Sequence, residues 1–102
     1  MSPRGLNQLT RVMAVALADK GVRVNAIGPG SIVTQLLEQV MVDDAARRNI
    51  LSRTPMRRCG AVSEVASIAV FLAADESSYV TGRCIYCDGG RLALNYVVPI
   101  TD

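Results

Sequence analysis

The chain has 102 residues, of which half are apolar, a fifth are charged and four are aromatic, and its formal net charge is +2. This composition predicts one small folded domain rather than a disordered chain. The arginines are spread out with few aromatic residues beside them, so we expect no nucleic-acid partner. Apolar runs end well before the roughly 20 residues of a membrane span, and no signal-peptide layout is present, so we expect a cytoplasmic protein without membrane contact.

Histidine is absent, and the three cysteines, Cys59, Cys84 and Cys87, are an odd number. The lack of histidine excludes Ser-His-Asp and Cys-His nucleophile pairs and removes a common zinc ligand. Cys84 and Cys87 form a CxxC pattern, but residues three apart on a strand point to opposite faces, and no second CxxC follows. We therefore expect structural thiols, no disulfide framework and no metal ligands.

The first predicted element is a helix over residues 2–20. Ser2 is a good N-cap and Pro3 suits the first helical position, because proline there loses no needed donor. Apolar residues recur at three- and four-residue steps and also on other sides, so we expect more than one buried face. Gly21 ends the helix.

The remaining elements alternate between strands and helices. A strand over 22–27 enters a Gly28-Pro29-Gly30 turn, and 28–34 leads to two short helices within 35–52, with Asp43 or Asp44 as the cap between them. Ser63 caps a helix over 63–74, a second strand covers 83–88, and 89–102 forms an extended tail that includes Tyr96 to Pro99.

Two strands separated by helices predict an α/β fold with a right-handed parallel crossover. Parallel strands are stable inside sheets that are covered on both faces, and two strands are too few for such a sheet. We therefore expect residues 1–102 to form a single partial domain of two strands and three to four helices. Either this domain lacks sheet neighbours that it is shaped to have, or association with another chain completes its sheet.

Two stretches carry a family resemblance: LNQLTRVMAVALADKGVRVNAIGPGSIVT and RTPMRRCGAVSEVASIAVFLAADESSYVTGRCIYCDGG. They resemble the C-terminal half of the short-chain dehydrogenase/reductase family, of the bacterial type that includes glucose dehydrogenases and 3-oxoacyl reductases. The match runs from about Leu6 to Gly90, with RVNAIGPG, FLAADESSYVTG and CDGG in the family's order and spacing. The resemblance implies a Rossmann-type parallel sheet and hydride transfer between NAD or NADP and an alcohol or carbonyl.

The resemblance also implies one wall of a cofactor site. In the family, the Pro-Gly turn and the next residues wrap the nicotinamide, backbone groups contact its carboxamide, and a threonine lies near the diphosphate. The matching residues here are Pro29, Gly30, Ser31, Ile32 and Thr34. Taken by itself, the tripeptide is also explained as a strand-ending turn. The glycine-rich turn that binds the diphosphate has no match, so we expect no measurable NAD(P) binding by this chain alone.

Catalysis in the family uses a tyrosine, a lysine four residues later and a serine. No tyrosine of this sequence has lysine at that spacing. The single lysine, Lys20, is preceded there by Ala16, and Pro3 stands where the family's lysine would be. We therefore predict no catalytic residue in this chain.

Residues 35–52 resemble the family's substrate-covering segment, with a solvent-facing helical pair as the alternative. Arg57 and Arg58 fit a solvated basic loop better than a phosphate site. The first helix, the helix from Ser63 and the second strand resemble subunit-contact elements, so we expect a homo-oligomer or association with a full-length relative.

Three functions remain open. We favour a truncated NAD(P)-dependent oxidoreductase that is inactive by itself. The alternatives are an oligomerisation or regulatory module, and the C-terminal half of a split active reductase. The substrate and the choice between NAD and NADP depend on parts of the site that have no match in this sequence.

Overall fold

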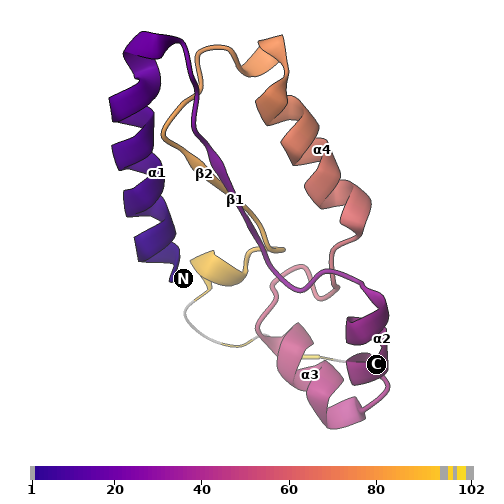
Figure 1. Cartoon of the computed structure of the whole chain (residues 1–102). Coiled ribbons are helices and arrows are strands. Elements are labelled where there is room, and N and C mark those ends of the chain that lie inside the picture. Colours follow the sequence, from indigo (N-terminus) through magenta and orange to yellow (C-terminus); the bar gives the residue numbers. More distant parts are fainter. Residues whose placement is uncertain (1, 95–96, 98, 101–102) are drawn as a thin grey trace. The chain divides into compact units, whose positions relative to one another are not determined.

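The computed structural model describes residues 2–94, 97, 99 and 100. It confirms the α/β class, with two parallel strands and four α-helices (Figure 1). The elements in chain order are α1 (Pro3–Leu17), β1 (Ala26–Pro29), α2 (Gln35–Met41), α3 (Asp44–Ser52), α4 (Val62–Ala73) and β2 (Cys84–Cys87). Single 3-10 turns lie at Ala18–Lys20, Asp75–Ser77 and Arg91–Ala93.

Helix α1 begins as its sequence predicts. The Ser2 hydroxyl accepts a hydrogen bond from the backbone N–H of Gly5 at 3.1 Å, and Pro3 occupies the first helical position. The chain leaves the helix through the Ala18–Lys20 turn, after which Gly21 adopts a left-handed conformation with φ of 72°.

The covered face of α1 is narrower than predicted. Thr10 and Ala14, four residues apart, are 4% and 3% exposed, whereas Val12 and Val15 are largely exposed. The expectation that more than one face is buried is therefore wrong for this chain by itself. The reason is that the described residues contain too few elements to cover the other apolar sides of the helix.

The two strands pair in parallel. Ala26 donates its N–H to the Arg83 carbonyl at 2.9 Å, and Gly30 donates to the Cys87 carbonyl at 3.0 Å, so the partner numbers rise together. β1 also ends later than the predicted strand, so Gly28 and Pro29 of the predicted turn belong to it, because the pairing with β2 continues to Gly30. β1 starts later than predicted because the backbone before it is held partly by side chains. The Val24 N–H bonds to the Thr81 hydroxyl at 3.0 Å instead of to a strand carbonyl.

By its contacts the chain divides into two compact units. The first comprises Met1–Gly28 and Ala66–Ile85, and so contains α1 and most of α4. The second comprises Pro29–Val65 and Tyr86–Asp102, and contains α2 and α3. β1 passes from the first unit into the second at Pro29, and β2 does so at Tyr86.

The helices of the second unit begin at polar caps. The Thr34 hydroxyl accepts from the Leu37 N–H at 3.2 Å, and the Asp43 carboxylate accepts from the Ala45 N–H at 3.2 Å. Ser63 is not the cap of α4, because it lies inside the helix. The third residue of α4, Glu64, instead accepts from the N–H of Ala61 at 2.9 Å, which is half of a capping box.

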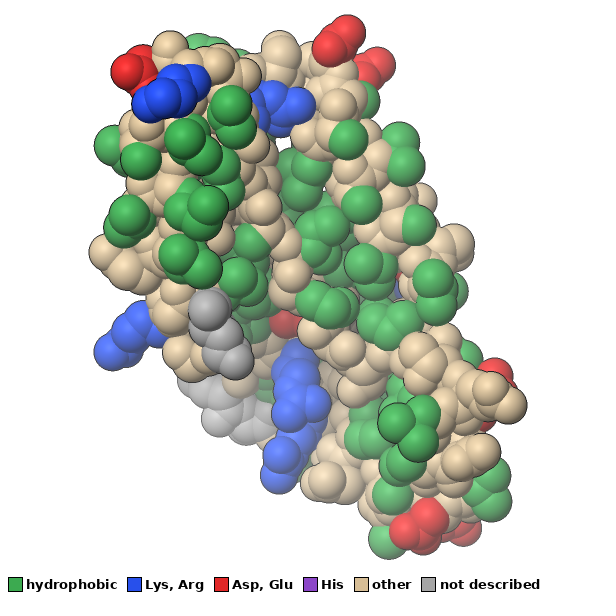
Figure 2. Space-filling view, in the orientation of Figure 1, with side chains coloured by type: hydrophobic (Ala, Val, Ile, Leu, Met, Phe, Trp, Pro, Cys, Tyr) green, Lys and Arg blue, Asp and Glu red, His purple; other side chains and the backbone are tan. Residues whose placement is uncertain are grey.

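Burial is sparse in the described residues. Ala14 and Leu51 are the buried apolar side chains, and Thr10, Thr54 and Ser77 are the buried polar ones. Large apolar side chains are exposed on every α-helix except α3, and Figure 2 shows them gathered over α1 and over α4. Much apolar surface of this chain is therefore left without protein cover.

The predicted tail, 89–102, is not extended at its start, because residues 91–93 form a 3-10 turn in which the Ala93 N–H donates to the Gly90 carbonyl at 3.1 Å. Tyr96 and Val98, which the extended tail was expected to include, lie outside the described residues.

Among the helices that the structure describes, none combines the length and apolar character required to cross a membrane.

Candidate functional site

The predicted cofactor residues follow the carboxyl end of β1. In a parallel sheet this edge is where ligands bind, because the loops that follow several strands meet there. The loop after β1 meets the loop after β2 directly, since a side chain on Gly30 would lie 2.8 Å from Cα and 2.9 Å from Cβ of Asp88. The glycine is therefore required by the close approach of these two loops. Pro29, beside it, is exposed.

Ser31, Ile32 and Val33 run alongside Gly60. The Gly60 N–H donates to the Ser31 carbonyl and the Val33 N–H donates to the Gly60 carbonyl, both at 2.8 Å, which makes a one-residue parallel bridge opposite Ile32. A side chain on Gly60 would lie 2.9 Å from the Ile32 side chain. The bridge fixes the backbone orientation of residues 31–33, and sequence reasoning did not predict it.

Among the described residues, Ile32 has a peptide N–H and C=O that the bridge to Gly60 leaves unbonded. Because residues 31 and 33 bond to Gly60, the N–H and C=O of Ile32 point away from it. Within residues 2–94, 97, 99 and 100, neither of these two groups has a hydrogen-bond partner. One donor and one acceptor on a single residue match the NH₂ and C=O of a carboxamide. The residues present therefore fit the nicotinamide group that the sequence predicts here.

Thr34 lies two residues beyond Ile32 at the start of α2. Its hydroxyl oxygen caps that helix by accepting from the Leu37 N–H, and the side chain is exposed. A hydroxyl that accepts one bond still has its own proton to donate. Thr34 can therefore hold the helix start and still donate to an anionic oxygen.

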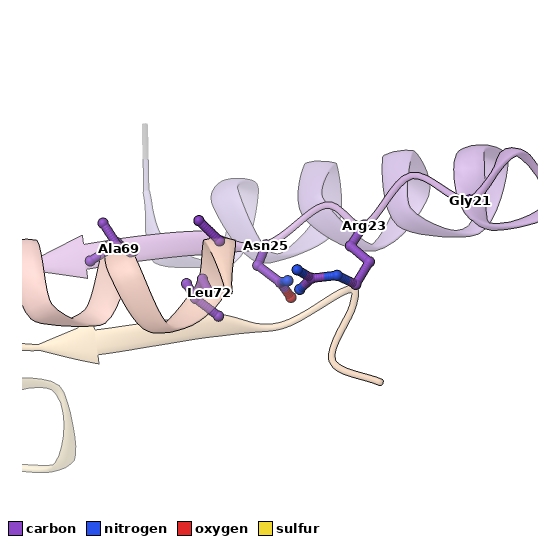
Figure 3. Close-up of a pocket in the computed structure, with 7 residues that line it drawn as sticks. Gly21, Arg23, Asn25, Ala69 and Leu72 are labelled. Carbon is purple, nitrogen blue, oxygen red and sulfur yellow. The ribbon is translucent and has the colours of Figure 1, made fainter. Parts of the chain in front are cut away.

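The first unit contains a hollow of about 620 Å³ between residues 21–27 and α4 (Figure 3). Its polar side chains, Arg23 and Asn25, are drawn pointing toward one another, with Ala69 and Leu72 on the facing helix (Figure 3). Arg23 donates to the Ser77 carbonyl at 3.0 Å, and Asn25 donates to the Val80 carbonyl at 2.9 Å. Because these donors are already engaged by the backbone, this hollow has a structural role.

Arg58 and Glu64 form a two-pronged ion pair, with nitrogen to oxygen distances of 2.8 Å and 3.0 Å. The hydrogen bonds from Arg58, and secondly the N–H of Ala61, lower the pKa of Glu64 to about 2. The same carboxylate raises the pKa of Arg58. Arg58 is therefore a capping partner of α4 rather than a free basic side chain, which sequence reasoning missed.

The three cysteines are free thiols and each is half-buried. In the part of the chain that the structure describes, no group of three or more Cys, Asp or Glu side chains could hold a metal ion. Burial raises the pKa of the Cys59 thiol.

Comparison with known proteins identifies the class. A family model described as enoyl-(acyl carrier protein) reductase matches residues 1–91. The 3-oxoacyl-[acyl-carrier-protein] reductase FabG of Thermotoga maritima is 46% identical over 89 residues, which are 87% of this chain and 35% of that protein. The chain therefore belongs to the short-chain dehydrogenase/reductase family, as predicted, and this family consists of NAD(P)-dependent oxidoreductases.

Solved structures give the same fold. A structure from Agrobacterium tumefaciens with bound NADP has a TM-score of 0.82 and 41% identity, covering 89% of this chain and 37% of that one. A 4-hydroxyisoleucine dehydrogenase complexed with NADH has a TM-score of 0.83 and 30% identity, covering 90% and 38%. The chain thus spans little more than a third of the length of the proteins it resembles.

Proposed function

We propose that this chain supplies the nicotinamide-side wall of an NAD(P)-dependent oxidoreductase that acts on an alcohol or carbonyl, and that the chain is inactive by itself. The observation that carries the proposal is the free N–H and C=O of Ile32, held at the carboxyl end of the strands by the bridge to Gly60. The family membership supports the cofactor class.

Each predicted residue has a definite part in this wall. Gly30 lets the loop after β1 lie against Asp88, and Ser31 accepts the bond from Gly60 that turns Ile32 outward. Ile32 would then hold the carboxamide through two backbone hydrogen bonds, and Thr34 would donate its hydroxyl proton toward the diphosphate. Pro29 would cover one side of the ring, because it is exposed at this edge.

The bound cofactor would supply a hydride donor or acceptor. This chain's own residues orient the carboxamide and thereby fix which face of the ring is presented. They move no proton, because no tyrosine of the sequence precedes a lysine at the family's spacing. The proton-transferring pair and the diphosphate-binding turn would have to come from outside these 102 residues.

A chimera tests the wall directly. Residues 6–91 of this chain would replace the matched segment of the Thermotoga maritima reductase, and NAD⁺ and NADP⁺ binding would be measured by calorimetry. We expect the chimera to bind one of them, whereas the 102-residue chain alone shows no saturable binding at the same concentrations. Ile32→Pro removes the N–H donor, so in the chimera it should weaken binding about tenfold or more.

The matched control is Ile32→Val, which keeps the peptide N–H and should bind as the parent chimera does. Circular dichroism of each variant separates loss of binding from loss of folding. Tight binding by the chain alone, or equal binding by the proline variant, would overturn the proposal.

A second proposal concerns association. The exposed apolar side chains of α1, among them Val12 and Val15, support a role in contacting a second copy or a full-length relative. This proposal is compatible with the first, because a chain that supplies one wall of a site needs a partner for the rest.

A further inference from the structure

The second unit contains a hollow of about 440 Å³ that the cofactor wall does not use. It lies between α2, the end of α3 and residues 57–59. Leu37 and Met41, four residues apart, present the same face of α2 to it, and Leu51 of α3 also lines it. Val33 and Val42 complete its apolar surface.

The size and lining of this hollow match a ligand site. Pockets that bind small molecules measure about 300–1,000 Å³ and are mainly apolar, whereas voids in packed cores are rarely larger than a water molecule. Leu51 is 8% exposed and Val42 is 83% exposed, so the hollow runs from a buried side chain to an open rim. An apolar chain entering it would gain burial against Leu37, Met41 and Leu51.

The charged residues around the hollow indicate which head group the ligand carries. Arg58 is neutralised by Glu64, as described above. Arg57 also lines the hollow, and its guanidinium has no hydrogen-bond or ion-pair partner among the described residues. Glu38 lines the α2 side and would repel an anion there. An anionic group is therefore best placed beside Arg57.

The backbone of Arg57 is held in position. Its φ is +60°, in the left-handed region, and its N–H donates to the Thr54 carbonyl at 2.8 Å. The Thr54 side chain is itself buried, with its hydroxyl bonded to the Ile50 carbonyl at 3.0 Å. Arg57 thus projects from a fixed turn that follows α3, so its backbone needs no further ordering around a ligand.

We propose that this hollow binds the apolar chain of an anionic amphiphile, with the head group paired to Arg57. This site is separate from the cofactor wall, because none of Pro29, Gly30, Ser31, Ile32 and Thr34 lines the hollow.

The test uses the full 102-residue chain without any nicotinamide cofactor. Calorimetric titration with octanoate and with 1-octanol should give saturable binding of both, with octanoate about tenfold tighter because of one charge-assisted contact. Arg57→Gln should reduce octanoate affinity to that of 1-octanol. Arg53→Gln, an exposed arginine outside the hollow, is the matched control and should leave the difference unchanged.

Leu37→Glu places a charge inside the hollow and should abolish binding of both probes. Leu36→Glu changes the neighbouring residue, which is 73% exposed and does not line the hollow, and should have no effect on binding. Circular dichroism confirms that each variant keeps its helices. Absence of binding by the parent chain, or loss of binding in both glutamate variants while folding is kept, would overturn the proposal.

Cys59 provides a second measurement that needs no variant, because it lines the same hollow. Octanoate should slow its alkylation, read by peptide mass spectrometry, while Cys84 and Cys87 in β2 serve as internal controls. Equal slowing at all three cysteines, or none at Cys59, would contradict the proposal. None of these results depends on cofactor binding, so failure here is distinct from failure of the chimera.

Discussion

The guanidinium of Arg23 donates to both the carbonyl and the hydroxyl oxygen of Ser77, at 3.0 Å and 3.1 Å, across 54 residues of sequence. Arg23 also reaches the Val80 and Ala74 carbonyls at 3.3 Å and 3.4 Å. Ser77 has no exposed surface and donates its own hydroxyl to the Leu72 or the Ala74 carbonyl. One side chain before β1 therefore donates to the carbonyl groups of three residues that follow α4.

Replacing Arg23 with lysine should destabilise the chain by about 2 kcal/mol. Lysine keeps the charge but loses the planar fork, so it cannot reach both Ser77 oxygens and the two neighbouring carbonyls at once. Urea denaturation followed by circular dichroism measures the change. Arg11→Lys is the control. Because Arg11 is exposed on α1, this variant should be as stable as the parent chain. Equal midpoints for the two variants would show that the Arg23 fork contributes no stability.

The helix starts that depend on neighbouring residues could be predicted from the sequence. Ser2 and Pro3 mark the start of α1, and Asp43 marks the start of α3, because capping depends on residues within one turn. The interactions of Arg23 and Asn25 could not be predicted, since their partners lie more than 50 residues away. The available signal was a charged residue between two valines in a strand pattern, which is costly unless it is paired.

The candidate site was predicted by resemblance, and its physical basis came from the structure. Sequence reasoning placed Ile32 in the cofactor wall and assigned the carboxamide contact to backbone groups, without saying which residue provides them. The bridge to Gly60 shows that its N–H and C=O are the free ones, and Gly60 is 28 positions further along the chain. Gly30 was predicted from a turn motif, whereas its neighbour Asp88 is what excludes a side chain there. Pairings of this kind leave no periodic signal in a single sequence.

Gly30→Ala should therefore destabilise the chain by about 1–3 kcal/mol. The added Cβ would lie 2.8 Å from Cα of Asp88, and backbone cannot move aside as a flexible side chain can. Urea denaturation measures the loss of stability. Gly21→Asn is the matched control, because nothing lies within 4 Å of a side chain at Gly21 and asparagine tolerates its left-handed φ. A control that loses as much stability as Gly30→Ala would refute the packing explanation.

The ion pair between Arg58 and Glu64 predicts that the stability of the folded chain falls at low pH. The pKa of Glu64 is lowered from about 4.5 to about 2 in the folded chain, so the unfolded chain binds this proton more readily. The contribution of Glu64 is present above about pH 4.5 and is lost as the pH falls toward 2. Urea midpoints measured from pH 6 to pH 2 should fall more steeply for the parent than for Glu64→Gln.

The control for that series is Glu38→Gln, an exposed glutamate without an ion-pair partner among the described residues. The urea midpoint of this variant should change with pH as that of the parent chain does. If Glu64→Gln also follows the parent curve, the ion pair does not contribute to stability in solution. Because both partners are partly exposed, the effect should shrink in high salt.

Cys59 should be a slow nucleophile in the folded chain. Burial raises its thiol pKa, and the thiolate is the reactive form, so less of it is present at a given pH. Alkylation by iodoacetamide at pH 8, resolved by peptide mass spectrometry, should be slower at Cys59 in buffer than in urea. Equal rates in the two conditions would mean that the thiol is accessible in the native state.

The exposed apolar side of α1 should make the chain associate. Val12 and Val15 are 56% and 80% exposed, and exposed apolar side chains that gather on one element mark protein contacts. Light scattering coupled to size exclusion should therefore give a mass above the 10.9 kDa of one chain. The double variant Val12→Lys, Val15→Lys should shift the mass toward the monomer, because two charges would be buried at the contact. Leu36→Lys removes an equally exposed apolar side chain from α2 and should leave the mass unchanged. A monomeric parent would contradict the association, and an equal shift in both variants would show that it is not specific to α1.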